Sequence, residues 1–256
     1  TGFKTLCSRN LVPDASQIVR PQKHFDTLLY TGNGATSSRA ITGLEFAPDF
    51  VWLKNRDETY HHQWHDTVRG VSGGVLYSNQ TSGQDSTYSL ASFDSNGFSI
   101  AKDANQSGQN KNGNDFVAWC WKAGGAAVSN SDGSITSSVS ANTKAGFSII
   151  SWTGNGTAGA TIGHGLGAAP QVAIVKRLGA SEDWHINIGL ILAKIGSGKD
   201  GHYVKFDTGT EGTQNGPFNS TNPSSTVITL GSDAASNDDG GGMICYAWTS
   251  IPGFSK

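Results

Sequence analysis

The sequence is poor in the residues that build helices and poor in charge of either sign. Only four glutamates and one methionine occur among 256 residues, against thirty-four glycines. This composition disfavours long helices and suits short strands joined by tight turns. The formal net charge is −2 and no long run of like charges occurs, so we do not expect a nucleic-acid partner.

Long apolar runs and a cysteine framework are also lacking. No apolar stretch approaches the roughly 20 residues needed to cross a bilayer, and the segment 186–195 is short and interrupted by Gly189. We therefore expect no membrane partner. Three cysteines cannot all pair with one another, and Cys120 and Cys245 lie in apolar strand-like runs, where a free thiol acts as a small buried hydrophobe.

What the sequence does contain is an internal repeat. Residues 30–34 read Tyr-Thr-Gly-Asn-Gly and residues 152–156 read Trp-Thr-Gly-Asn-Gly, an offset of 122 (152 − 30). At the same offset Pro48 and Lys54 recur as Pro170 and Lys176. Self-similarity at a fixed period predicts two copies of one structural unit.

Each copy consists of short strand-like runs between turn signals, without a helical period of ten or more residues. We predict an all-β fold of two tandem β-sandwich-like repeats joined by a Gly/Ser-rich linker, where each sandwich could take a jelly-roll or lectin-like form. Residues 1–23 are expected to be a connecting segment from an upstream region, 24–125 the first repeat, and 126–256 a linker strand followed by the second repeat. The strand with Trp119 and Trp121 should match the strand with Tyr246 and Trp248.

Four segments carry a family resemblance: Gly-Leu-Glu-Phe-Ala-Pro-Asp-Phe-Val-Trp-Leu-Lys-Asn-Arg (43–56), Asp-Thr-Val-Arg-Gly (66–70), Phe-Asp-Ser-Asn-Gly-Phe (93–98) and Phe-Val-Ala-Trp-Cys-Trp-Lys-Ala-Gly-Gly (116–125). They resemble repeats in large structural proteins of tailed bacteriophages, and the resemblance covers residues 24–256. It implies a β-rich virion component, on the tail or outer surface, that contacts other virion proteins. It implies no catalytic residues.

Oligomerisation is a further expectation. The resemblance favours a homo-oligomer, with a trimer preferred for a tail fibre. Strands that are apolar on both faces support the same expectation, because both faces must be covered by another sheet. The segment 66–70 has no counterpart in the second copy, so its role is expected to belong to the first copy alone.

Three functions from different classes remain open. The first is a receptor-binding or adhesin domain of a tail fibre, which contacts the host surface. The second is a purely structural shaft, decoration or assembly domain of the virion, and the third is a polysaccharide depolymerase. We favour a non-enzymatic protein without a cofactor, because no pair of carboxylates recurs in both copies as glycoside hydrolysis would require. Unequal Gly- and Asn-rich loops favour recognition over plain spacing.

The candidate binding site is aromatic. Trp64 and Trp184 lie in polar surroundings and are followed by His65 and His185, while Tyr60 and His62 flank the first tryptophan. Exposed rings among hydrogen-bonding groups could stack on a sugar and contact its hydroxyls, so we predict a glycan- or receptor-binding site at these six residues. The alternative is that each tryptophan closes one end of its sandwich. The other five tryptophans lie in strand-like runs and are expected in the core: Trp52, Trp119, Trp121, Trp152 and Trp248.

Metal and phosphate sites are weaker hypotheses. His61, His62, His65 and Asp66 form the densest ligand-like cluster, but the second copy offers only His185, so a hydrogen-bonding loop is favoured. Asp233, Asp238 and Asp239 could supply oxygen ligands to Ca²⁺, although EF-hand spacing is missing. The Gly-Ser-Gly-Lys at 196–199 is not a phosphate loop, because Ala193 and Asp200 stand where glycine and Ser or Thr are needed.

Overall fold

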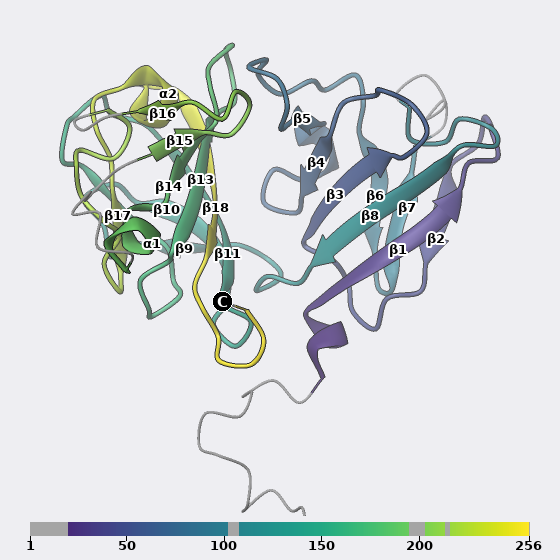
Figure 1. Cartoon of the computed structure of the whole chain (residues 1–256), viewed down its shortest axis with the longest axis horizontal. Helices are drawn as coiled ribbons and strands as arrows, with labels where there is room; N and C mark the ends of the chain where they lie inside the picture. The colour runs from purple at the N-terminus through teal and green to yellow at the C-terminus, as the bar shows by residue number, and fades with distance from the viewer. Residues whose placement is uncertain (1–19, 102–107, 195–202, 213–215, 256) are drawn as a thin grey trace, which may run out of the picture.

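The structure, a computed structural model, describes residues 20–101, 108–194, 203–212 and 216–255 (Figure 1). The phosphate-loop-like segment 196–199 lies outside them. Two 3₁₀ turns, Pro21–Lys23 and Val71–Gly73, occur in the first half. The strands of the first half are β1 (Phe25–Thr31), β2 (Arg39–Thr42), β3 (Phe50–Asn55), β4 (Gln63–Asp66), β5 (Leu76–Tyr77), β6 (Leu90–Asp94), β7 (Gly97–Ile100) and β8 (Asp115–Trp121).

The second half contains ten strands and two short helices among the described residues. The strands are β9 (Val128–Asn130), β10 (Ser137–Asn142), β11 (Phe147–Thr153), β12 (Thr161–Gly163), β13 (Val172–Arg177), β14 (His185–Asn187), β15 (Tyr203–Lys205), β16 (Glu211–Gly212), β17 (Val227–Thr229) and β18 (Gly242–Trp248). The helices are α1 (Gly189–Lys194) and α2 (Ala234–Asn237). The fold is all-β and of the sandwich type, as the composition predicts.

The two halves share one strand order. The large sheet of the first half runs β1-β8-β3-β4-β5, and the corresponding stretch of the second runs β11-β18-β13-β14-β15, all antiparallel. Phe25 pairs with Trp121 in the first half, and Phe147 pairs with Trp248 in the second. The predicted match between the strands of Trp121 and Trp248 is therefore confirmed.

Four layers of sheet result, because each large sheet is apolar on both faces. In β3, Val51 and Leu53 point to a core shared with the small sheet β2-β7-β6, while Phe50 and Trp52 point the other way. In β18, Cys245 and Ala247 point to a core shared with the small sheet β12-β17, while Ile244 and Tyr246 point the other way. The remaining faces of the two large sheets pack against each other, and we call this contact the seam.

This packing changes one argument from the sequence. The apolar strands that suggested a homo-oligomer are covered within a single chain, since the first half and the second half cover each other. The trimer stays a prediction, and it now depends on the family resemblance alone.

The repeated Thr-Gly-Asn-Gly motif has a structural role in both halves. A Cβ on Gly32 would lie 2.1 Å from the carbonyl oxygen of Lys111, and a Cβ on Gly154 would lie 2.2 Å from that of Asp238, so only glycine fits. The next residue, Asn33 or Asn155, exchanges hydrogen bonds with a fully buried asparagine, Asn110 or Asn237. The motif therefore fastens the end of β1 to the turn before β8, and the end of β11 to helix α2 before β18.

Candidate functional site

Trp64 and Trp184 meet inside the seam. Their rings lie edge to face with centroids 4.9 Å apart, and they are 1% and 0% exposed. The indole Nε1 of Trp184 donates hydrogen bonds to the carbonyl oxygens of Tyr77 (3.1 Å) and Gln80 (3.0 Å) in the first half. The expectation that these two rings are exposed for stacking is wrong, because both are needed to join the halves.

The two tryptophans are also not equivalent. Trp64 pairs with Trp52 on β3, whereas the matching pair in the second half is Ile186 with Ile174. The counterpart of Trp184 is His62: the carbonyl of His62 accepts from Ser78 N, and that of Trp184 accepts from Phe206 N. The offset of 122 therefore continues through β14, so Trp184 does not occupy the position that matches Trp64.

The histidines that follow these tryptophans are buried as well. His65 is 2% exposed, and burial lowers its pKa to about 3; His185 is 3% exposed, and burial lowers its pKa to about 4. Both imidazoles face the inside of their own sandwich rather than the seam, because they alternate with Trp64 and Ile186 along their strands. Neither is open to a ligand in this structure.

The cluster of His61, His62, His65 and Asp66 does not converge. His61 lies 3.1 Å from Asn79 Nδ2 and 2.8 Å from Gln80 Nε2, through its two ring nitrogens. Within the described ranges, no three His, Cys, Asp or Glu side chains are placed to hold a metal ion together. Of the calcium candidates, Asp233 accepts from Ala235 N at the start of α2 and Asp238 forms an ion pair with Arg177 at 2.6 Å.

Asp66 has a different partner, which lies across the seam. Its Oδ2 accepts from Arg69 Nε at 2.6 Å and from the hydroxyl of Tyr246 at 2.7 Å. All three side chains are buried, and Arg69 also donates to the carbonyls of Trp64 and Gly73. Burial acts to lower the pKa of Arg69, but Asp66 and Tyr246 together outweigh burial and raise this pKa. The segment 66–70 thus fixes the second half to the first, which agrees with its occurring in the first copy only.

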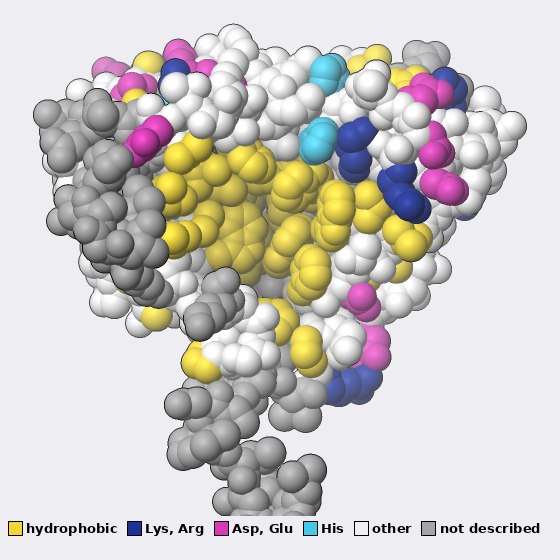
Figure 2. Space-filling model, in the orientation of Figure 1, with side chains coloured by type: hydrophobic (Ala, Val, Ile, Leu, Met, Phe, Trp, Pro, Cys, Tyr) yellow, Lys and Arg dark blue, Asp and Glu magenta, His cyan; other side chains and the backbone are white. Residues whose placement is uncertain are grey.

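Half-buried apolar side chains, most of them aromatic, remain along one end of the seam. We call this group the aromatic furrow; its members are Trp52, Trp119, Trp121, Val172, Ile186, Phe206 and Trp248. Figure 2 shows hydrophobic side chains gathered in a hollow between the two halves. Two ring pairs cross the seam, Trp121 with Trp248 at 6.2 Å and Trp52 with Phe206 at 6.1 Å.

A polar pocket adjoins the furrow at His62. The His62 ring lies 6.2 Å from the Trp52 ring, and both Tyr60 and His62 are half-buried. The pocket has a volume of about 430 Å³ and is lined by Lys54, Arg56, Asp57, Glu58, Thr59, Tyr60, His62 and Asn79. Burial and the nearby Lys54 lower the pKa of His62, so the ring is neutral near pH 7 and can donate and accept hydrogen bonds. Of the six residues proposed from the sequence, Tyr60 and His62 alone lie at this open region.

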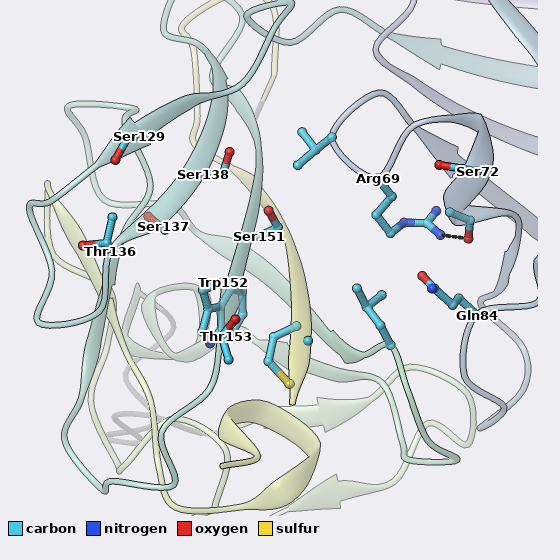
Figure 3. Close-up of a pocket in the computed structure, with 15 residues that line it drawn as sticks. Arg69, Ser72, Gln84, Ser129, Thr136, Ser137, Ser138, Ser151, Trp152 and Thr153 are labelled. Atoms are coloured by element: carbon cyan, nitrogen blue, oxygen red, sulfur yellow. Dashed lines mark hydrogen bonds between the residues drawn. The ribbon is translucent and has the colours of Figure 1, made fainter. Parts of the chain in front are cut away.

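A second hollow lies at the other end of the seam. β18 runs from Met243 at this hollow to Trp248 at the furrow. The hollow, which we call the hydroxyl cleft, has a volume of about 660 Å³ and lies between the two halves (Figure 3). Its second-half wall includes Ser129, Ser138, Ser151 and Thr153, and its first-half wall includes Arg69, Ser72 and Gln84.

The carboxylates of Asp183 and Asp207 lie together in the second half. Their side chains are hydrogen-bonded, and Lys205 holds Asp183 in an ion pair at 2.5 Å, which lowers the pKa of Asp183. Burial and the neighbouring Asp183 raise the pKa of Asp207. Glycosidases separate their two carboxyl groups by about 5 Å or more to flank the sugar, so a pair in direct contact does not have that geometry.

Sequence reasoning missed the furrow because its tryptophans were assigned to the core. Trp119 and Trp121 do alternate with buried Ala118 and Cys120, so the shared face was predictable. The alternation does not predict that the face with Trp119 and Trp121 packs against another sheet along only part of its length. Trp152 alone of the five is buried, at 5% exposure.

Comparisons with known proteins identify the family of this chain, but they give no information on its chemical activity. Among the described residues, no helix is both long and apolar enough to span a membrane. No curated protein and no solved structure matches the chain. A family model matches residues 20–256, which is almost the whole length. The chain therefore belongs to the family described as a domain of unknown function, DUF7483.

Proposed function

We propose that this chain is a non-enzymatic component of a tailed-bacteriophage virion, a tail-fibre or adhesin domain that contacts glycan on the host surface through the aromatic furrow. The observation that carries the proposal is the set of half-buried indole rings of Trp52, Trp119, Trp121 and Trp248. The family resemblance of the repeats supports the location in a virion. The surrounding partners are other virion proteins.

The furrow suits a sugar for a physical reason. A pyranose ring has apolar C–H faces and hydroxyl groups around its edge, so it gains both from a flat aromatic surface and from polar groups beside it. Trp52 packs against Trp119 in a tilted arrangement with ring centroids 5.3 Å apart, which fixes both indoles before a ligand arrives. The adjoining pocket at Tyr60 and His62 supplies hydroxyl and imidazole groups for the sugar edge.

Two other functions fit less well. A purely structural domain would explain the rigid joint at Asp66, Arg69 and Tyr246, but it gives no reason for a hollow with four partly open indoles. A depolymerase needs two carboxyl groups across a groove, and the contact pair Asp183 and Asp207 lacks the required separation.

The test is Trp119→Ala, measured by binding of the purified chain to an array of bacterial surface polysaccharides. Trp119 is half-buried and packs on Trp52, so its loss should weaken binding about fivefold, the equivalent of about 1 kcal/mol for one aromatic contact. Leu29→Ala is the matched control. Leu29 is 67% exposed on the neighbouring strand β1, outside the furrow.

Thermal melting of both variants separates binding from folding. The proposal predicts that both variants melt close to the parent and that Trp119→Ala alone loses binding. Equal binding by Trp119→Ala and the parent would remove the furrow as a glycan site and leave the structural role as the better function.

A further inference from the structure

The hydroxyl cleft holds a row of side chains that the fold does not use. Ser129 pairs with Ser138, and Ser138 pairs with Ser151, so the three serines lie side by side across β9, β10 and β11. Neighbouring strands are about 4.8 Å apart, so the hydroxyls form an evenly spaced line on the face that looks toward the first half. Among the described residues, these three hydroxyls make no hydrogen bond (Figure 3).

The opposite wall offers more neutral polar groups. Ser72 and Gln84 reach the cleft from the first half, and their side chains are likewise not hydrogen-bonded within the described ranges. Ser137 lies next to the row of serines but differs from them, because its hydroxyl donates a hydrogen bond to the carbonyl of Gly163 at 3.0 Å. Free groups on both walls therefore face one open volume of about 660 Å³, which lies within the range of small-ligand sites.

Charge in the cleft is already compensated. Among the described residues of the lining, Arg69 is the one that carries a charge, and its guanidinium is held by Asp66 at 2.6 Å and by the carbonyls of Trp64 and Gly73. An anionic ligand would find no free cation among the lining residues, and a cationic ligand would find no carboxylate. The cleft thus fits a neutral ligand.

Hydroxyl groups narrow the ligand class further. A serine hydroxyl donates one hydrogen bond and accepts others, and it rotates to suit its partner. A row of them can pair with the hydroxyls of a polyol whichever way these point. Val68 and Leu178 add an apolar edge to the same cleft, which suits the C–H face of a sugar ring.

We infer that the hydroxyl cleft is a binding site for a neutral saccharide, separate from the aromatic furrow. The inference does not depend on the proposed function, because a structural virion domain could hold a sugar in this cleft as well. Ser138 and Ser151 are the central contacts, with Ser72 and Gln84 closing over the ligand from the first half.

The experiment is a titration of the ¹⁵N-labelled chain with methyl glycosides of glucose, galactose, mannose and N-acetylglucosamine, followed by amide chemical shifts. At least one neutral glycoside should shift the amides of the cleft lining in a saturable way. Glucuronic acid and glucosamine are the charged probes, and they should bind more weakly than the neutral sugar.

Three variants locate the effect. Ser138→Ala with Ser151→Ala should weaken binding of that glycoside about fivefold or more, since two hydrogen bonds are lost. Ser131→Ala, an exposed serine beside β9 and outside the lining, should leave binding unchanged, and so should Trp119→Ala in the furrow. Circular dichroism confirms that each variant is folded.

Several outcomes would overturn the inference. One is that no neutral glycoside shifts the lining amides; a second is that a charged sugar binds as tightly; a third is that the double serine variant binds like the parent. A glycoside that shifts only the furrow amides would support the proposed function and reject the cleft. A short peptide that shifts the cleft amides where glycosides do not would replace the saccharide with a peptide ligand.

Discussion

The two halves repeat one strand order, yet the same lysine has two different environments in them. Lys54 on β3 is half-buried, and its Nζ donates to the carbonyls of Asn55 and Glu58 in its own half. Lys176, at the matching position of β13, is 0% exposed and donates to Thr81 in the first half and to Glu182, both at 2.7 Å. Burial lowers the pKa of Lys176 to about 8, despite the opposing effect of Asp207, Glu182 and Asp183.

The cause of this difference is a loop of the first half that covers the second. Residues 77–85 lie against the turn between β13 and β14: Gln84 N donates to Leu178 O and Glu182 N donates to Thr81 O, both at 2.8 Å. Gly83 allows this approach, because a Cβ there would lie 2.5 Å from Leu178 O. Duplication therefore produced one asymmetric body, in which equivalent positions took on different roles.

The largest difference in stability is expected between substitutions of Trp64 and of Ile186, its counterpart in the second half. Trp64→Ala should lower the free energy of unfolding by about 3 to 5 kcal/mol, since a fully buried ring leaves a cavity among Phe50, Trp184 and Tyr246. Ile186→Ala should cost about 1 to 2 kcal/mol, because Ile186 is half-buried at the furrow and solvent can fill the space. Urea denaturation of both variants measures the difference. Equal losses would mean that the seam is not closed at Trp64.

The next effect is an acid sensitivity shared by both halves, since each buries a neutral histidine. An unfolded histidine binds a proton below about pH 6.5, whereas folded His65 and His185 stay neutral down to pKa values of about 3 and about 4. The unfolded state thus binds more protons in this window, and stability falls as the pH falls, by about 1.4 kcal/mol per pH unit for each histidine.

Substituting each histidine in turn shows how much of the pH dependence of stability comes from His65 and how much from His185. His65→Gln should flatten the profile from pH 6.5 toward 3, and His185→Gln from pH 6.5 toward 4. Urea melts of the parent and both variants at a series of pH values give the slopes. A parent and a variant with parallel profiles would show that the substituted histidine is already protonated in the folded state.

Much of this architecture was predictable, and what was missed has a common cause. Alternation along residues 116–121 predicted the correct faces, and the repeat predicted that the two halves would share one strand order, because these patterns are visible within one strand or from one copy to the next. The polar context of Trp64 and Trp184 was misleading, since their neighbours in sequence are not their neighbours in space. Trp184 lies against Tyr77 and Gln80, more than one hundred residues earlier. No local pattern encodes a contact between two copies of the same unit.

A smaller effect is expected at the two lysines. Lys176→Ala leaves the carbonyls of Thr81 and Glu182 without their donor in a buried place, which should cost about 1 to 3 kcal/mol. Lys54→Ala should cost less than about 1 kcal/mol, because water can reach the carbonyls of Asn55 and Glu58 more easily. Denaturation near pH 7 compares them. A larger loss for Lys54→Ala would contradict the asymmetry of the two positions.

The last effect concerns the hydroxyl that joins the halves at Asp66. Tyr246→Phe removes one hydrogen bond to Asp66 Oδ2 and should cost about 1 kcal/mol, since Arg69 still compensates the carboxylate at 2.6 Å. Asp66→Asn adds a control, because it removes the charge that Arg69 needs and should cost more than Tyr246→Phe. In the double variant the two losses should not add, because each single variant already weakens the same hydrogen bond between Tyr246 and Asp66. Denaturation of the four proteins measures this coupling. Strictly additive losses would show that the Tyr246 hydroxyl and the Asp66 carboxylate are not coupled, and that this hydrogen bond does not stabilise the joint between the halves.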